Sequence, residues 1–123
     1  MCIRDSVLFT AHLAPMNRGI LATCYGRPAK DGITTDDALQ ALADFYEDDP
    51  FMVVSERSPS TKATLGSNSV HLTARVDPRT GTVMAIAALD NLMKGASGMA
   101  VQNANLALGI EETMGLSSIG VYP

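Results

Sequence analysis

The stretch VHLTARVDPRTGTVMAIAAL, residues 70–89, decides the fold because it contains two strands and the turn between them. Apolar and polar residues alternate through its first half, so that one face of a strand would carry Val70, Leu72, Ala74 and Val76. Residues 77–81, Asp-Pro-Arg-Thr-Gly, have the composition of a tight turn. Residues 82–89 are apolar at nearly every position, which is typical of a central strand covered on both faces. This pattern predicts an antiparallel hairpin at the centre of a sheet.

The segments before this hairpin predict further strands and a helix. Residues 7–13 and 20–25 have the pattern of strands on either side of an irregular turn, and residues 51–55 have that of another strand. Between them, Thr34 and the acidic residues that follow it supply a helix cap. The apolar residues of that helix recur at helical spacing and form a stripe of Leu39, Leu42, Ala43 and Tyr46. We expect the helix to stop by Asp49-Pro50.

With a last helix after residue 90, the expected order of elements is β-β-α-β-β-β-α. Hairpin signals dominate, which favours an α+β fold with a mostly antiparallel sheet and helices on one face. A chain of 123 residues, 46% of them hydrophobic, is sufficient for one core, so we expect a single domain over residues 7–123. Residues 1–6, which include Cys2, show no periodicity and are a tail of no assigned role, compatible with an artefact.

The composition argues against several classes of function. A formal net charge of −4 disfavours nonspecific nucleic-acid binding, which needs clustered basic residues, although a small anionic ligand needs only one or two donors. No apolar stretch approaches the roughly 20 residues of a membrane span, and the first residues do not resemble a signal sequence, so we expect a cytoplasmic protein. Two cysteines form neither a disulfide framework nor a metal-ligand set, so no metal is expected.

Four residues have side chains used in catalysis or binding, but each also has a structural interpretation. Cys24 alternates with apolar residues and is expected to point into the core, without the nearby base that a nucleophile needs. His12 and His71 lack a Cys, Ser or carboxylate at motif spacing, which favours structural histidines. Arg18 lies in an irregular turn, where its guanidinium is either presented to a carboxylate or phosphate or simply solvated.

The stretch ALDNLMKGASGMAVQNANLALG, residues 88–109, predicts a helix with two glycines and three amide side chains. Each interior glycine costs a helix about 1 kcal/mol relative to alanine, so Gly95 and Gly98 indicate a backbone that a ligand or a second helix approaches closely. Residues 65–69, Leu-Gly-Ser-Asn-Ser, suit either a polar pocket wall or an ordinary turn. The chain contains no dinucleotide fingerprint, P-loop, Cys-x-x-Cys or His-Glu-x-x-His motif, and hence no complete catalytic set.

Three segments resemble a known family, in that family's order. They are FTAHLAPMNRGILATCYGRP (residues 9–28), LGSNSVHLTARVD (residues 65–77) and AALDNLMKGASGMAVQNANLALGIEETMGL (residues 87–116). Together they resemble the C-terminal half of the N-acetyl-gamma-glutamyl-phosphate reductases, and the match covers residues 7–123. The core of the third segment is also similar to the aspartate-semialdehyde dehydrogenases. The resemblance implies the C-terminal fold of the glyceraldehyde-3-phosphate and semialdehyde dehydrogenases, a substrate and dimerisation domain.

The resemblance implies an oxidoreductase reaction that this chain does not perform alone. In that family, NADPH reduces N-acetyl-glutamyl phosphate to the semialdehyde in arginine biosynthesis, through a cysteine thioester and proton transfer by a histidine. The family's glycine-rich cofactor loop, nucleophilic cysteine and proton-transfer histidine all precede the part that this chain resembles. Cys24 and His12 match other positions of the family, so neither inherits a catalytic role.

The resemblance also implies which residues contribute to binding. Asn91 would face the carboxamide of the NADP nicotinamide, and Gly95 and Gly98 would allow close packing where the last helix returns to the cofactor domain. From its place in the irregular turn, Arg18 is the residue expected to contact the substrate. The alternative is that Asn91 or Asp90 merely caps the helix.

Two functions stay open at this point. The first is the substrate and dimerisation half of the reductase, a homo-oligomer (dimer or tetramer) that associates through its sheet. The second is a non-enzymatic interaction domain that keeps the fold and the oligomer surface. A cofactor half with a cysteine motif encoded upstream would favour the first function, whereas a short reading frame with its own start signals would favour the second.

Overall fold

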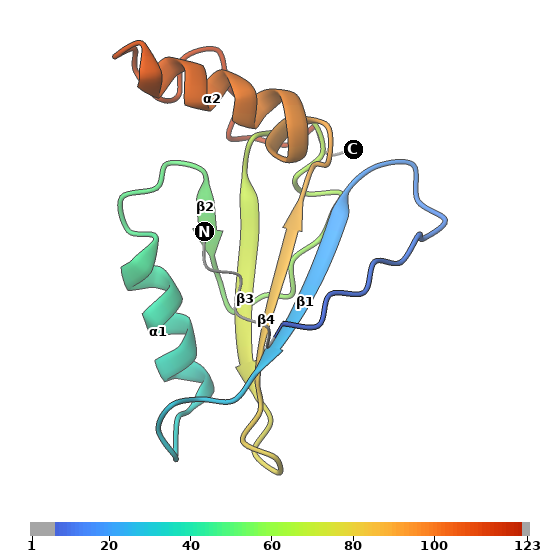
Figure 1. Cartoon of the computed structure of the whole chain (residues 1–123), viewed down its shortest axis with the longest axis vertical. Coiled ribbons are helices and arrows are strands. Elements are labelled where there is room, and N and C mark those ends of the chain that lie inside the picture. The colour runs from blue at the N-terminus through green and yellow to red at the C-terminus, as the bar shows by residue number, and fades with distance from the viewer. Residues whose placement is uncertain (1–6, 122–123) are drawn as a thin grey trace.

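Four strands form one sheet in the computed structural model of the chain, which describes residues 7–121 (Figure 1). The strands are β1 (Ile20–Gly26), β2 (Met52–Val54), β3 (Val70–Val76) and β4 (Val83–Leu89). Their order across the sheet is β1-β4-β3-β2. Strand β4 is antiparallel to both neighbours, whereas the short β2 is parallel to β3. The predicted α+β fold with a mostly antiparallel sheet is confirmed.

The central hairpin forms as predicted, and β3 and β4 pair along their whole length. The N–H of Asp77 donates to the carbonyl of Thr82 at 3.0 Å, and the N–H of Gly81 donates to the carbonyl of Asp77 at 2.8 Å. Gly81 has a φ of +67°, a left-handed conformation that disfavours residues with a side chain. The turn residues therefore predicted the hairpin because their own backbone preferences form it.

Helix α1 (Thr35–Phe45) begins where the sequence predicts. The hydroxyl of Thr34 accepts the N–H of Asp37 at 3.2 Å, and the carboxylate of Asp37 accepts the N–H of Thr34 at 2.9 Å, which together form a capping box. The helix ends before the expected limit at Asp49-Pro50 and packs mainly on β3. No residue of α1 is fully buried, so its apolar stripe is only half covered.

Residues 7–13 do not form the predicted strand, which corrects that expectation. They have no regular secondary structure, and the side chains of Leu8 and Leu13 are almost completely exposed. A strand needs a neighbour to pair with its backbone N–H and C=O groups, and no strand within residues 7–121 pairs with this segment. The apolar pattern is therefore present without the pairing that would make it a strand.

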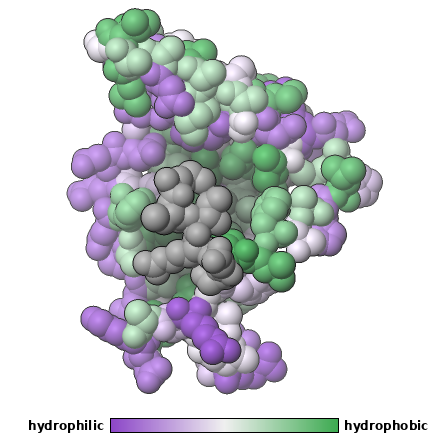
Figure 2. All heavy atoms as spheres, viewed as in Figure 1, coloured by the Kyte–Doolittle hydropathy of each residue, from purple (hydrophilic) through white to green (hydrophobic). Residues whose placement is uncertain are grey.

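Strand β4 is central, as predicted, but it is not covered on both faces. Only Ala88 of this strand is buried. Helix α1 lies over β3 and β2, so within the described part of the chain no helix lies over β1 (Figure 1). A groove of about 370 Å³ stays open between α1 and the sheet, with Phe45, Val83 and Ala85 among its lining residues. Figure 2 shows hydrophobic residues gathered on this side of the molecule.

Cys24 is exposed, which contradicts its predicted place in the core. It lies on β1 opposite Ala85, on the side of the sheet that α1 leaves uncovered at this strand. The alternation that predicted burial is real, but no element among residues 7–121 packs on that part of β1.

The fully buried core is small and partly polar. Its apolar members are Phe51, Val70, Leu72, Ala74 and Ala88. Residues 65–69 contribute polar members, because Asn68 and Ser69 are buried and hydrogen bonded to the C-terminal segment. The N–H of Asn68 donates to the carbonyl of Ser117, and the hydroxyl of Ser69 donates to the carbonyl of Ser118, each at 2.7 Å. This polar segment is therefore part of the interior.

The last helical segment lies across one end of the sheet (Figure 1). It consists of a π-helical turn, η1 (Met93–Ser97), followed by α2 (Gly98–Ala107). Neither of these, nor α1, is long and apolar enough to cross a membrane, and this holds for every helix within residues 7–121. The segment places Asn91 at the junction between β4 and the helix.

Candidate substrate and cofactor site

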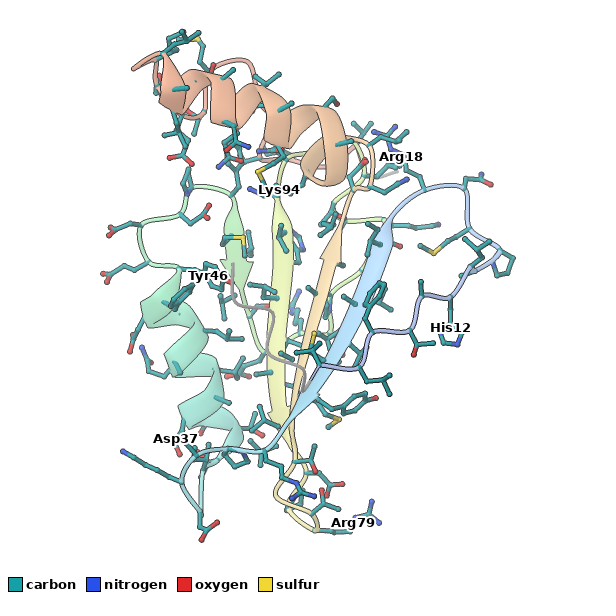
Figure 3. All side chains as sticks on the ribbon, in the orientation of Figure 1. His12, Arg18, Asp37, Tyr46, Arg79 and Lys94 are labelled. Atoms are coloured by element: carbon teal, nitrogen blue, oxygen red, sulfur yellow. The ribbon has the colours of Figure 1, made fainter. Side chains whose placement is uncertain are left out.

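Arg18 and Asn91 come together at the end of the sheet where β1 begins and β4 ends. The Nε of Arg18 donates to the carboxylate of Asp90 at 2.9 Å, and the backbone N–H of Gly19 donates to Oδ1 of Asn91 at 2.7 Å. These contacts continue the pairing of β1 with β4 beyond the ends of both strands. Figure 3 shows Arg18 at this end, near the start of the last helical segment. The structure thus brings together residues 18–19 and residues 90–91, which the sequence separates by more than 70 residues.

Asp90 is the centre of this contact, although the sequence suggested only a helix cap for it. Its carboxylate is buried and accepts hydrogen bonds from Arg18 Nε and from the backbone N–H groups of Gly66, Leu92 and Met93 at 2.6, 2.8 and 3.0 Å. Burial raises the pKa of Asp90, but the hydrogen bonds, led by that from Gly66, outweigh it and lower the pKa to about 2. The carboxylate is therefore ionised throughout the neutral range.

These hydrogen bonds show which residue, Asp90 or Asn91, caps the helical segment. Asp90 caps the helical segment, because its Oδ1 accepts the N–H groups of Leu92 and Met93. The Oδ1 of Asn91 instead accepts the N–H of Gly19. Since a backbone N–H must face an acceptor, the carboxamide is oriented with its Nδ2 away from Gly19. This NH₂ group makes no hydrogen bond within residues 7–121 and is available to donate to another acceptor.

The two glycines of the segment have different surroundings. Gly98 is buried, and a Cβ at this position would collide with Oδ1 of Asn68 and would lie 2.9 Å from the carbonyl oxygen of Met93. Gly95 is exposed, and a Cβ there would lie 3.3 Å from the carbonyl oxygen of Asp90. The close approach expected at Gly98 is therefore made by this chain's own Asn68, whereas Gly95 presents bare backbone to the surface.

A buried polar cluster beneath α2 was missed in the sequence, where it appeared only as a run of amides. Gln102 is its centre: Oε1 accepts from Lys94 Nζ at 2.8 Å and from Asn68 Nδ2 at 2.9 Å, and Nε2 donates to a Glu112 oxygen at 2.6 Å. The Nζ of Lys94 also lies 5.3 Å from the centre of the Phe51 ring, a cation–π distance. The cluster connects η1, α2 and the segment that follows α2.

The other amides of α2 differ in burial. Asn105 is buried, and its Nδ2 donates to the carbonyls of Glu112 and Met114 at 3.1 and 2.9 Å. Asn103 is exposed. Two of the three amides therefore hold the C-terminal segment against the helix.

The remaining candidates do not assemble into a catalytic group. Cys24 and His12 are exposed, and His71 is half buried, with its pKa lowered because burial disfavours the charged ring. By strand register, Cys24 shares a sheet face with Ala85, whereas His71 shares the opposite face with Ala88. No group of three or more His, Cys, Asp or Glu side chains placed to hold a metal occurs within residues 7–121.

The fold agrees with a family assignment. Residues 3–91 match the family model described as semialdehyde dehydrogenase, dimerisation domain, and the chain belongs to this family. The resemblance stated from the sequence is thereby confirmed.

Comparison with individual proteins gives a more specific relationship than the family match. The chain is 54% identical to the N-acetyl-gamma-glutamyl-phosphate reductase of Acidothermus cellulolyticus, 51% identical to that of Desulforudis audaxviator and 49% identical to that of Thermoanaerobacter sp. strain X514. Each alignment extends over 120 residues, or 96% of this chain. The chain spans about a third of the length of these relatives, 34–35%.

Proposed function

We propose that the chain is the C-terminal part of an N-acetyl-gamma-glutamyl-phosphate reductase and belongs to its substrate and dimerisation domain. Identities of 49–54% to three such reductases over nearly the whole chain support this assignment. The observation that carries the proposed site is the contact of residues 18–19 with residues 90–91 at the end of the sheet. The complete enzyme is proposed to be a cytoplasmic oxidoreductase of arginine biosynthesis.

Arg18 is proposed to bind the anionic substrate, N-acetyl-glutamyl phosphate. Its side chain is about a third exposed, and only its Nε is hydrogen bonded within residues 7–121. The two terminal nitrogens can therefore donate to a carboxylate or phosphate, groups that match the planar guanidinium. The cysteine and histidine chemistry is assigned to the rest of the reductase, because Cys24 and His71 lie on opposite faces of the sheet.

Asn91 is proposed to hold the nicotinamide ring of NADP, which supplies the hydride when it is bound. The donor chemistry fits: Gly19 fixes Oδ1, so Nδ2 is left to donate to the carbonyl oxygen of the ring's carboxamide. Gly95 is the glycine proposed to lie close to the cofactor, since it is exposed. Gly98 contributes indirectly, by letting α2 pack on Asn68.

The face of β1 opposite the one that α1 packs against is proposed as the surface for self-association. Leu21 and Tyr25 of β1 are exposed by 56% and 71%, and the family is described as a dimerisation domain. A homodimer, or a tetramer built from such dimers, would bury this apolar surface.

Activity of the complete protein tests the proposal. The complete reductase that contains this chain should oxidise NADPH only when N-acetyl-glutamyl phosphate is present, whereas residues 1–123 alone should be inactive because the thiolate and the cofactor loop are absent. Turnover by residues 1–123 alone would contradict the division of roles. A complete protein without such activity would favour the interaction-domain alternative.

A further inference from the structure

The Asp90 carboxylate joins three segments that are far apart in the sequence. Its donors come from the turn before β1 (Arg18), the loop before β3 (Gly66) and the start of the last helical segment (Leu92 and Met93). The Asp90 side chain is 0% exposed, and hydrogen bonds hold both carboxylate oxygens. A charge buried with this set of donors has one orientation in which all of them are satisfied.

This contact fixes the direction of the Arg18 guanidinium. The Nε of Arg18 lies 2.9 Å from Oδ1 and 2.8 Å from Oδ2 of Asp90. Because the guanidinium is planar, fixing Nε also fixes the directions of both terminal nitrogens. An arginine without this anchor would sample many rotamers, which binding a ligand would have to restrict.

The same carboxylate holds the backbone on both sides of Asn91. Asp90 precedes it, and the N–H groups of the next two residues donate to Oδ1 of Asp90. On the opposite strand, Gly19 directly follows Arg18 and donates to the Asn91 side chain. Two parallel contacts, Arg18 with Asp90 and Gly19 with Asn91, therefore set both side chains in one arrangement.

We propose that Asp90 is a positioning residue that aligns the Arg18 guanidinium with the Asn91 carboxamide and so couples the substrate subsite to the nicotinamide subsite. This inference rests on the proposed function, in which Arg18 contacts the acyl phosphate and Asn91 contacts the cofactor. Asp90 touches neither ligand and acts through these two neighbours.

Kinetics of the complete reductase test the coupling. Asp90→Asn should lower kcat/KM for both the acyl phosphate and NADPH by about tenfold to a hundredfold, the loss expected for a charged hydrogen bond. The double variant Arg18→Gln/Asp90→Asn should lose no more kcat/KM for the acyl phosphate than Arg18→Gln alone, because Asp90 acts on this substrate through Arg18. Asp77→Asn is the matched control: its carboxylate pairs with Arg79 in the exposed hairpin turn, and its kinetics should be unchanged.

Different outcomes would overturn different claims. If Arg18→Gln and Asn91→Ala both leave the kinetics unchanged, the proposed function is wrong. If those variants are impaired but Asp90→Asn is not, or if the losses at Arg18 and Asp90 multiply in the double variant, only the positioning role is wrong.

Should Asp90→Asn fail to fold, ¹⁵N NMR of the unmodified reductase tests the positioning role instead. The Nε–H of Arg18 should exchange with solvent much more slowly than that of exposed Arg79, and equal rates would refute the positioning role.

Discussion

Gly98 shows how a single absent side chain determines the packing of a helix. Its Cα faces Oδ1 of Asn68, a buried oxygen that accepts no hydrogen bond within residues 7–121. A methyl group at this position has no room, since the backbone of Met93 is on its other side. The helix therefore keeps a residue of poor helix propensity so that α2 can lie on the end of the sheet.

We expect Gly98→Ala to destabilise the protein and Gly95→Ala to be nearly neutral. Overpacking costs about 1–3 kcal/mol, and the collision with Asn68 and the Met93 backbone places this site at about 2–3 kcal/mol. Better helix propensity returns about 1 kcal/mol, so the net loss at position 98 should be about 1–2 kcal/mol. At exposed Gly95 the two effects should cancel to within about 0.5 kcal/mol. Thermal unfolding of both variants measures this difference. Equal melting temperatures would show that the contact with Asn68 carries no such cost.

At the scale of elements, the polar cluster around Gln102 holds α2 to the sheet. Lys94 is 8% exposed and lies with its Nζ between the Gln102 oxygen and the Phe51 ring. Gln102 links this buried ammonium to the Glu112 carboxylate through its two amide atoms. Removing the amide would leave a buried charge without its acceptor.

Gln102→Leu should therefore lower the free energy of unfolding by about 3 kcal/mol, within the range for breaking a buried charged contact. Asn103→Leu, on the same helix but exposed, is the matched control and should change it by less than about 0.5 kcal/mol. Adding Lys94→Met to Gln102→Leu should restore part of the loss, because the unpaired charge is gone. Urea unfolding compares the three proteins, and equal stability of the two leucine variants would refute this account.

The elements that the sequence predicted well are those fixed by neighbouring residues. The hairpin depends on the residues of its own turn. The cap of α1 depends on two reciprocal hydrogen bonds between Thr34 and Asp37, three positions apart. Asp90 and Gln102 were missed as contact centres because their partners lie up to 72 and 34 residues away. The turn predicted a binding role for Arg18, and the resemblance predicted one for Asn91. The contact of residues 18–19 with residues 90–91 depends on the pairing of β1 with β4, which local spacing does not specify.

At the scale of the whole molecule, both faces of the sheet are open at β1: Cys24 is exposed on the face that α1 packs against, and Leu21 and Tyr25 are exposed on the opposite face. The strand predicted at residues 7–13 does not form, and Cys24 is not buried, because neither has a partner that covers it within residues 7–121. A specific interface typically buries about 800 Å² per partner.

We therefore expect the complete protein to be at least a dimer in solution. Light scattering at tens of micromolar, far above the dissociation constant of about 1 nM to 1 μM typical of specific dimers, should give at least twice the mass of one chain. Leu21→Glu on exposed β1 should shift the protein towards monomer, whereas Lys30→Glu in the exposed loop after β1 should not. A stable monomer before any substitution would contradict the proposed interface.

The most direct test of the proposed function compares Asn91→Ala with Asn103→Ala in the complete reductase. Losing the Nδ2 donor in a largely dry site costs about 1–3 kcal/mol, so kcat/KM for NADPH should fall roughly tenfold to a hundredfold at position 91. Exposed Asn103 should show no change. Asn91→Ala also leaves the Gly19 N–H without its acceptor, so a slightly lower melting temperature is expected as well. A lower melting temperature with normal NADPH kinetics would contradict the account, because Asn91 would then serve only the junction between β1 and β4.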